Sequence, residues 1–466
     1  MTKQNYKGLI TDKQLKRIVT GRFMQRLANN GTVSAAVMVF AAIMAIICAN
    51  TDLYYEIHEV LSSPITVALG EFNCSISVEA FINDFLMAIF FLLVGIELKY
   101  EVTVGELRRP RQAMLPMLAA VGGVVVPACI YGCINRGGAV HGWAIPMATD
   151  IAFALGVLSL LGNRVPNGIK VFFTTLAIAD DLLAIVAIAL FYGQTPSFFW
   201  LCCTAVVTAL LILLNHRQVF NLRPYLGLGL MLWFCMYQSG IHATLAGVIL
   251  AFCIPARSDI RTDYLVDWMY DQLPSIADRY DDDKHILGQH DFTAAVGNFE
   301  RVTHRVTPPL QRLENKISIP VNFIILPIFA FANAQVRLVG ADLTALIMDP
   351  VTLGTHFGML LGKPIGIIGV TYLLVKLGLA ELPRGVNWNH IVGVGILGGI
   401  GFTMSILIAG LAFPTLLEEQ LASKTAILCA SVSSAILGMI YMSYVCKKPS
   451  ASKDNSQSNI KGKDTE

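Results

Sequence analysis

The chain has 466 residues, of which 55% are hydrophobic and 14% are charged, and its mean hydropathy is +0.61. Soluble domains carry about 25% charged residues, so this composition excludes an ordinary soluble protein and indicates one that crosses a membrane several times. The net charge of +2 gives no indication of nucleic-acid binding. The ten cysteines form no C-x-x-C pair, and we expect neither a disulfide framework nor a structural metal site.

The N-terminal residues are polar and rich in Lys and Arg, and they precede the first apolar run. We therefore expect no cleavable signal there. Between the basic residues, apolar ones recur every four positions, at Leu15, Val19, Phe23 and Leu27. This spacing predicts an amphipathic helix at the membrane surface; a solvated basic leader is the alternative.

Twelve apolar segments follow, each near the length of about 20 residues that a bilayer requires. They lie near residues 29–50, 80–103, 113–134, 142–162, 167–192, 197–215, 222–238, 241–256, 317–337, 352–376, 388–412 and 422–446. The predicted fold class is therefore an all-α polytopic membrane protein with about twelve spans. Its segments are a cytoplasmic N-terminus, eight spans, a long cytoplasmic loop, four spans and a disordered cytoplasmic tail, at residues 1–28, 29–256, 257–316, 317–446 and 447–466.

The distribution of basic residues gives the orientation of these spans. With the N-terminus inside, the cytoplasmic segments hold 30 Lys and Arg residues and the outer loops hold 3. Such a bias places both termini in the cytoplasm and agrees with an even number of spans. The one remaining basic residue is Lys363, which lies inside the tenth span.

Two connecting segments have patterns of their own. Residues 65–79 alternate in a β-like way on both sides of a Gly-Glu pair, which predicts a hairpin on the outer face. Residues 257–316 form a loop of unusual length that is acidic in its first half and helix-like from about 290. Loops of this length are usually functional or disordered.

Charged side chains inside the spans are the strongest functional signal, because each costs roughly 2.5–3.5 kcal/mol near the bilayer centre. Six charged residues lie there: Asp84, Glu97, Asp150, Asp180, Asp181 and Lys363. The first two are near the ends of their span, where reaching towards the interface is an alternative explanation. The other four are deeper and indicate an ion pathway.

The adjacent aspartates point in different directions on a helix, so they do not both face the same partner. Lys363 is the natural partner for one of them, and the other is then free to line a site. A purely structural ion pair is the alternative, but it needs one aspartate for the lysine rather than the three that are present. A small hard cation prefers oxygen ligands of this kind.

Two of the spans carry signs of an interrupted helix. The span at 142–162 has Pro146 followed by Thr149 and Asp150, and the span at 388–412 has five glycines between 393 and 401. Each is the middle member of a group of three spans, and interrupted helices at corresponding places in two halves are typical of a transporter's ion site. Close helix packing is the alternative for the glycines. His242, at the start of the eighth span, is either a pH sensor or a packed interfacial residue.

Several stretches together resemble the NhaA-type sodium/proton antiporters: "FINDFLMAIFFLLVGIELK", "GWAIPMATDIAFALGVLSLLGNRVP", "LAIADDLLAI", "SGIHATLAGVI", "LPIFAFANA", "LLGKPIGI" and "VGILGGIGFTMSI". The resemblance implies inverted repeats with two broken helices, spans four and eleven, that cross in mid-membrane. It implies a secondary antiporter in a bacterial inner membrane, not an enzyme, that exchanges cytoplasmic Na⁺ or Li⁺ for external H⁺. More than one H⁺ per Na⁺, regulation by pH and the absence of a cofactor are part of this expectation.

The resemblance also assigns roles to single residues. Asp180 and Asp181 become the pair that binds the cation and the protons, and Asp150 and Lys363 offset the half-helix ends. Thr149 becomes an accessory ligand. Candidates for the pH response are Glu97, Glu101, Glu314 and His242. The hairpin at 65–79 is a candidate contact for a homodimer.

Departures from the family pattern concern the pH response. Tyr100, Asn315 and Ser318 replace basic residues or histidines of some relatives, and the loop before the ninth span is longer.

Two other classes of protein remain as alternatives. A cation channel would use the same charges, whereas a membrane aspartyl protease would need Tyr-Asp and Gly-x-Gly-Asp contexts, which the sequence lacks.

Overall fold

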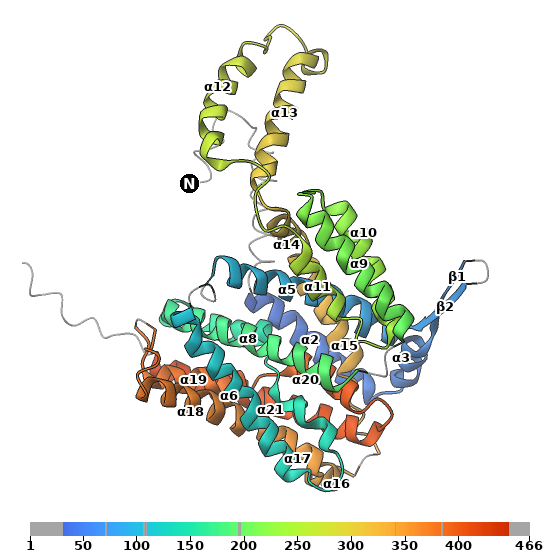
Figure 1. Cartoon of the computed structure of the whole chain (residues 1–466). Helices are drawn as coiled ribbons and strands as arrows, with labels where there is room; N and C mark the ends of the chain where they lie inside the picture. Colours follow the sequence, from blue (N-terminus) through green and yellow to red (C-terminus); the bar gives the residue numbers. More distant parts are fainter. Residues whose placement is uncertain are drawn as a thin grey trace, which may run out of the picture.

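The computed structural model describes residues 31–69, 72–105, 108, 110–193, 197–340, 342–383 and 385–446. The amphipathic segment expected at 9–27 and the tail from 447 onwards lie outside these residues. The described chain is a bundle of helices from which two elements project (Figure 1). One is a β-hairpin, and the other is a pair of helices, α12 (Leu265–Ala277) and α13 (His290–Val306), which stands away from the bundle.

Nine helical segments of the described chain are long and apolar enough to cross a membrane. They are α2 (Gly31–Ala49), α4 to α5 (Val78–Thr103), Ala113–Ile134 of α6 (Pro110–Ile134), η3 to α7 (Val140–Leu160), α8 (Asn167–Phe191), α9 (Phe198–His216), α14 to α15 (Pro309–Asn333), α17 to α18 (Pro350–Lys376) and α21 (Leu417–Val445). The pair α19 (Trp388–Gly398) and α20 (Phe402–Ala412), bent by 44°, makes a tenth. The chain therefore has the fold of a helical polytopic membrane protein.

The other two expected spans, 222–238 and 241–256, correspond to α10 (Leu222–Ser239) and α11 (Leu245–Cys253). α10 carries Arg223 and Gln238, which lower its mean hydropathy. α11 has only 9 residues, because Gly240 takes a left-handed conformation with φ of 83° and a turn follows it. By length and composition alone, ten of the twelve expected spans are therefore present.

Three spans contain a stretch of π-helix, a form that often marks functional sites. These stretches are η1 (Phe81–Leu86) before α5 (Met87–Thr103), η7 (Val321–Ile325) between α14 (Pro309–Pro320) and α15 (Leu326–Asn333), and η8 (Gly358–Gly362) between α17 (Pro350–Phe357) and α18 (Lys363–Lys376). The π-helix η8 ends directly before Lys363. Its wider turn therefore sets the position from which the Lys363 side chain leaves the helix.

Glycine allows α6 and α18 to cross at very short range. A Cβ atom on Gly366 would lie 2.1 Å from the carbonyl oxygen of Gly122, and a Cβ atom on Gly362 would lie 2.8 Å from the Cα atom of Pro127. Neither backbone atom can rotate away. Close approach of this kind is how membrane helices associate where lipid supplies no hydrophobic driving force.

The expected hairpin is confirmed. β1 (Pro64–Leu69) and β2 (Phe72–Ser77) pair in an antiparallel register that runs from Pro64 opposite Ser77 to Leu69 opposite Phe72. The hairpin follows helix α3 (Leu53–Ser62) and extends beyond the helices at one end of the bundle (Figure 1).

The long segment before α14 is more ordered than the sequence suggested. The predicted helix from about 290 is present as α13 and α14, but the acidic half also contains α12, which was not predicted. The two helices of the projecting pair are held by ring contacts, with Trp268 and Phe299 stacked at 5.6 Å between centroids. The acidic run at 278–284 lies beyond the end of α12, and it suggested a loop for this whole half of the segment.

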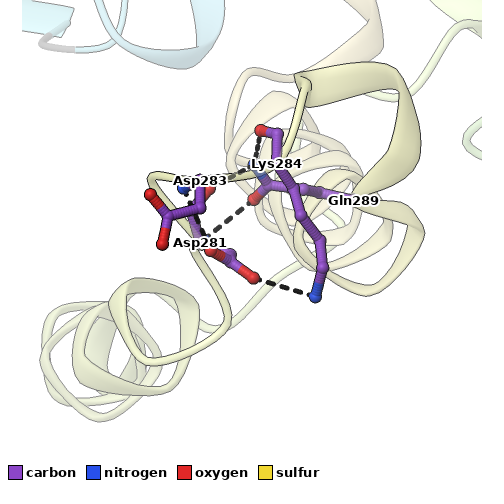
Figure 2. Close-up of polar contacts among 4 residues, drawn as sticks. All are labelled: Asp281, Asp283, Lys284 and Gln289. Carbon is purple, nitrogen blue, oxygen red and sulfur yellow. Dashed lines mark hydrogen bonds and ion pairs between the residues drawn. The ribbon is translucent and has the colours of Figure 1, made fainter.

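Gln289 organises the turn that joins α12 and α13 (Figure 2). Its side chain accepts a hydrogen bond from the Asp281 amide at 3.0 Å and donates to the carbonyls of Asp281 and Lys284, each at 2.7 Å. The Lys284 ammonium lies 2.8 Å from the Asp281 carboxylate. The Asp281 carboxylate accepts hydrogen bonds from the Lys284 ammonium and from the Asp283 amide, and these hold the pKa of Asp281 below its ordinary value.

The remaining short elements are α4 (Val78–Ala80), η3 (Val140–Met147), α7 (Ile151–Leu160), η4 (Gly162–Arg164), η5 (Thr262–Tyr264), η6 (Ile286–Gly288) and α16 (Leu343–Met348).

Candidate ion-binding site

The two adjacent aspartates lie in the middle of α8 and are buried, with exposed fractions of 0% for Asp180 and 2% for Asp181. Lys363, at the start of α18, is also fully buried and forms an ion pair with Asp180. The contact expected between these two residues is therefore present. Asp181 points elsewhere, as expected for a neighbour about 100° further round the helix.

Thr149 completes the contact between these charges. Its hydroxyl lies 2.6 Å from Oδ2 of Asp180 and accepts a hydrogen bond from the Lys363 ammonium at 2.9 Å. The same hydroxyl lies 3.1 Å from the carbonyl oxygen of Gly398, so its one proton is shared between two acceptors. Thr149 thus joins α8, α18 and the end of α19 at a single oxygen.

Asp150 sits where two helix ends meet. It is the N-cap of α7, and its Oδ1 accepts a hydrogen bond from the Phe153 amide at 3.0 Å. Its Oδ2 accepts two more from Thr403, from the amide at 3.1 Å and from the hydroxyl at 2.6 Å. Thr403 lies in the first turn of α20, so one carboxylate serves the positive ends of two helices.

The backbone is not helical at 148–150 or at 400–401, and these two segments touch each other. The Asp150 amide donates to the carbonyl of Ile400 at 2.7 Å. A Cβ atom on Gly401 would lie 2.6 Å from the carbonyl oxygen of Ala148. Gly401 therefore permits close packing and also lies at the 44° bend between α19 and α20.

A cavity of about 180 Å³ opens beside these segments. Asp181, Asp150, Thr149, Thr403 and Glu97 contribute polar groups to its wall. The Oδ1 atom of Asp181 is buried and has no hydrogen-bond partner among the described residues. A buried oxygen without a partner is rare, and in a polar cavity it is a ready ligand for a cation or a proton.

The acidic candidates for the pH response form one group. Glu97 on α5 is half-buried and lines the cavity. The negative charges of Glu314 and Glu101 act on it, and α14, which carries Glu314, packs against α5. Asp84 is also half-buried but is not part of the cavity wall.

His242 has a different environment from these glutamates. Its Nε2 atom lies 2.8 Å from the carbonyl oxygen of Tyr192, the residue that ends α8. An imidazole N–H that satisfies a helix-end carbonyl agrees with the packed interfacial interpretation.

Two further residues of this region were not predicted from the sequence. Thr403 was only part of a motif, although a threonine at the start of a half-helix is a recognisable polar signal. Lys99, two residues after Glu97, donates hydrogen bonds to three carbonyls at the end of α11: those of Ala251, Phe252 and Ile254. That contact spans more than 150 residues and has no local sequence signal.

Comparison with known proteins agrees with this geometry. The profile of the family described as Na⁺/H⁺ antiporter 1 matches residues 25–442. The chain belongs to the NhaA family of Na⁺/H⁺ antiporters. It is 44% identical to the Na⁺/H⁺ antiporter NhaA of Oleidesulfovibrio alaskensis over 412 residues, which are 88% of this chain and 91% of that protein.

Two further NhaA relatives are similarly close. The protein of Pseudomonas putida strain GB-1 is 43% identical over 431 residues, covering 92% of this chain and 98% of its own length. That of Helicobacter pylori strain G27 is 41% identical over 415 residues, covering 88% and 93%. NhaA proteins are membrane transporters, so family membership excludes the protease alternative.

Proposed function

We propose that this chain exchanges cytoplasmic Na⁺, or Li⁺, for external H⁺ across a bacterial inner membrane. The proposal includes twelve spans, two broken crossing helices and cytoplasmic termini. The observation that carries it is the unpartnered Oδ1 of Asp181 in the polar cavity, next to the buried pair of Asp180 and Lys363. The names of the NhaA relatives support the same pair of ions.

The proposed mechanism is competition for the same oxygens. Sodium binds to the carboxylates of Asp180 and Asp181, with Thr149 as an accessory ligand. The Lys363 ammonium already occupies Oδ2 of Asp180, so an arriving cation competes with it. Protons bind to the carboxylates after the cation leaves, and titration belongs to the coupled group as a whole.

Charge movement follows from this arrangement. Two carboxylates and one lysine are available to carry protons against a single sodium ion, so we propose more than one H⁺ per Na⁺. Exchange in proteoliposomes should then change with the membrane potential. Identical rates at potentials of opposite sign would show an electroneutral cycle and contradict this part of the proposal.

Asp150 and Thr403 are proposed to hold the two half-helices in register. Their hydrogen bonds join segments that are about 250 residues apart in the sequence. Glu97, Glu101 and Glu314 are proposed to set the pH at which exchange begins, and His242 is a weaker candidate because its contact is a helix-end carbonyl. The hairpin of β1 and β2 is the proposed homodimer contact.

A cation channel is the alternative, since the same buried charges would serve conduction. The two functions differ in whether the ions compete. In everted vesicles with an acid interior, added Na⁺ should release protons with a saturable dependence on Na⁺, and raising the proton concentration should weaken the apparent Na⁺ affinity. A non-saturating Na⁺ current that needs no counter-transported proton would favour the channel.

A further inference from the structure

Basic side chains gather at the junction of α13 and α14, at the base of the projecting helix pair. A shallow cavity of about 340 Å³ lies there, lined by Gly297, Glu300, Arg301, His304, Arg305 and Arg312. Three guanidinium groups and an imidazole thus share a space with a single carboxylate. We call this group the α13–α14 basic cavity.

Few of these positive charges are neutralised by neighbouring residues. Arg305 has a long ion pair with Asp259, at 3.6 Å. Arg312 donates to the carbonyl of Phe220 and to Nδ1 of His304, each at 3.2 Å, and neither of these partners is a carboxylate. Its Nε atom is buried and has no hydrogen-bond partner among the described residues. Like charges held together repel, so an anion in the cavity would stabilise this arrangement.

The cavity also lies beside the start of a candidate membrane span. Arg312 belongs to the first turn of a candidate span, Pro309–Asn333. Phe220, which Arg312 contacts, lies between the end of α9 and the start of α10. Three helix ends therefore meet beside the cavity, at the boundary where the bundle gives way to the projecting pair (Figure 1).

We propose that the α13–α14 basic cavity binds a phosphate group, carried by a lipid headgroup or by a free phosphate ion. Guanidinium groups match phosphate oxygens in geometry and charge, and basic pockets between helices on the cytoplasmic side bind anionic headgroups. Binding joins α13 to α14 and so connects the projecting pair to the bundle. This site is separate from the proposed ion site and does not depend on transport.

The test uses the purified full-length protein and a pair of matched variants. Arg301→Gln with His304→Gln removes two groups from the cavity, and Arg279→Gln with His285→Gln makes the same chemical change at the tip of the projecting pair. All four side chains are exposed, so folding should be preserved. Binding of inorganic phosphate is titrated in detergent against chloride at equal ionic strength. Retention of phosphatidylglycerol over phosphatidylcholine is measured in nanodiscs.

We expect the cavity variant to bind at least tenfold more weakly than the unaltered chain and the tip variant to stay within twofold. Retention of phosphatidylglycerol identifies a lipid headgroup, and saturable binding of phosphate without lipid identifies a free ion; either result supports the site. In the unaltered chain, phosphate or phosphatidylglycerol should slow phenylglyoxal labelling of Arg301 but not of Arg279. Equal effects of the two variants, or no preference over chloride and phosphatidylcholine, would overturn the proposal.

Discussion

The substitution Thr149→Val tests whether the hydroxyl of Thr149 is a sodium ligand. Valine has nearly the same shape as threonine and lacks the hydroxyl. In the structure this hydroxyl contacts Asp180 at 2.6 Å and Lys363 at 2.9 Å. Hydrogen bonds to charged groups contribute about 1.5–3 kcal/mol each. Thr149→Val therefore affects both the resting ion pair and, in the proposed mechanism, one sodium ligand.

The direction of the change separates these two roles. If the hydroxyl is a sodium ligand, its loss should weaken apparent Na⁺ affinity by a factor of about 10, since a tenfold change corresponds to about 1.4 kcal/mol. If it only stabilises the pair of Asp180 and Lys363, its loss should leave the affinity unchanged or make it tighter. Thr149→Ser keeps the hydroxyl and is the matched control.

The assay is Na⁺-induced proton release in everted vesicles, titrated with Na⁺ at fixed pH, with the amount of inserted protein measured in the same membranes. We expect Thr149→Val to need about tenfold more Na⁺ for half-maximal release and Thr149→Ser to stay close to the original chain. Unchanged or tighter affinity in the valine variant, with normal insertion, would refute the ligand role.

The remaining predictions concern the packing around the site and the pH response. Lys363→Met should destabilise the purified protein by about 3–5 kcal/mol, because it leaves a buried carboxylate unpaired, and adding Asp180→Asn should recover much of this loss in thermal melts. Gly366→Ala should lower the melting temperature, since its Cβ atom would meet a backbone oxygen at 2.1 Å, whereas Gly369→Ala on the same helix has open space and should not. Glu314→Gln should move the onset of exchange to lower pH with the maximal rate largely kept, because the negative charge of Glu314 acts on Glu97. Deleting α12 with the tip of its helix pair should leave the pH profile nearly unchanged, and the opposite pattern would place the pH response in the projecting pair.

The sequence was sufficient to predict features that depend on a single charged residue or on a short repeating pattern. Asp180 and Lys363 were recognisable because charged side chains are expensive inside a membrane, and only one lysine lay deep enough to be the partner. The hairpin was recognisable from its alternation, which the structure reproduces from Pro64 to Ser77. The glycine run was also identified, although the sequence could not choose between packing and a bend that involve the same residues.

What the sequence could not supply depends on contacts between distant segments. Asp150 finds Thr403 only when two interrupted helices meet, and no local pattern encodes that encounter. The eighth expected span proved to be the short helix α11, whose last carbonyls are satisfied by Lys99 and not by further helical turns. Helix α12 was hidden because acidic residues suggested a loop, while the stacking of Trp268 on Phe299 depends on a second helix.

Asp181 is proposed to bind sodium and protons alternately, and Asp181→Asn should abolish both. The asparagine has the same size and keeps one oxygen, but it can neither carry the charge nor take up the proton. In reconstituted proteoliposomes, we expect this variant to fold and insert normally and to show no Na⁺-induced proton movement at any pH from 6.5 to 9. Saturable exchange at a rate near that of the unaltered chain would contradict the assignment of the site.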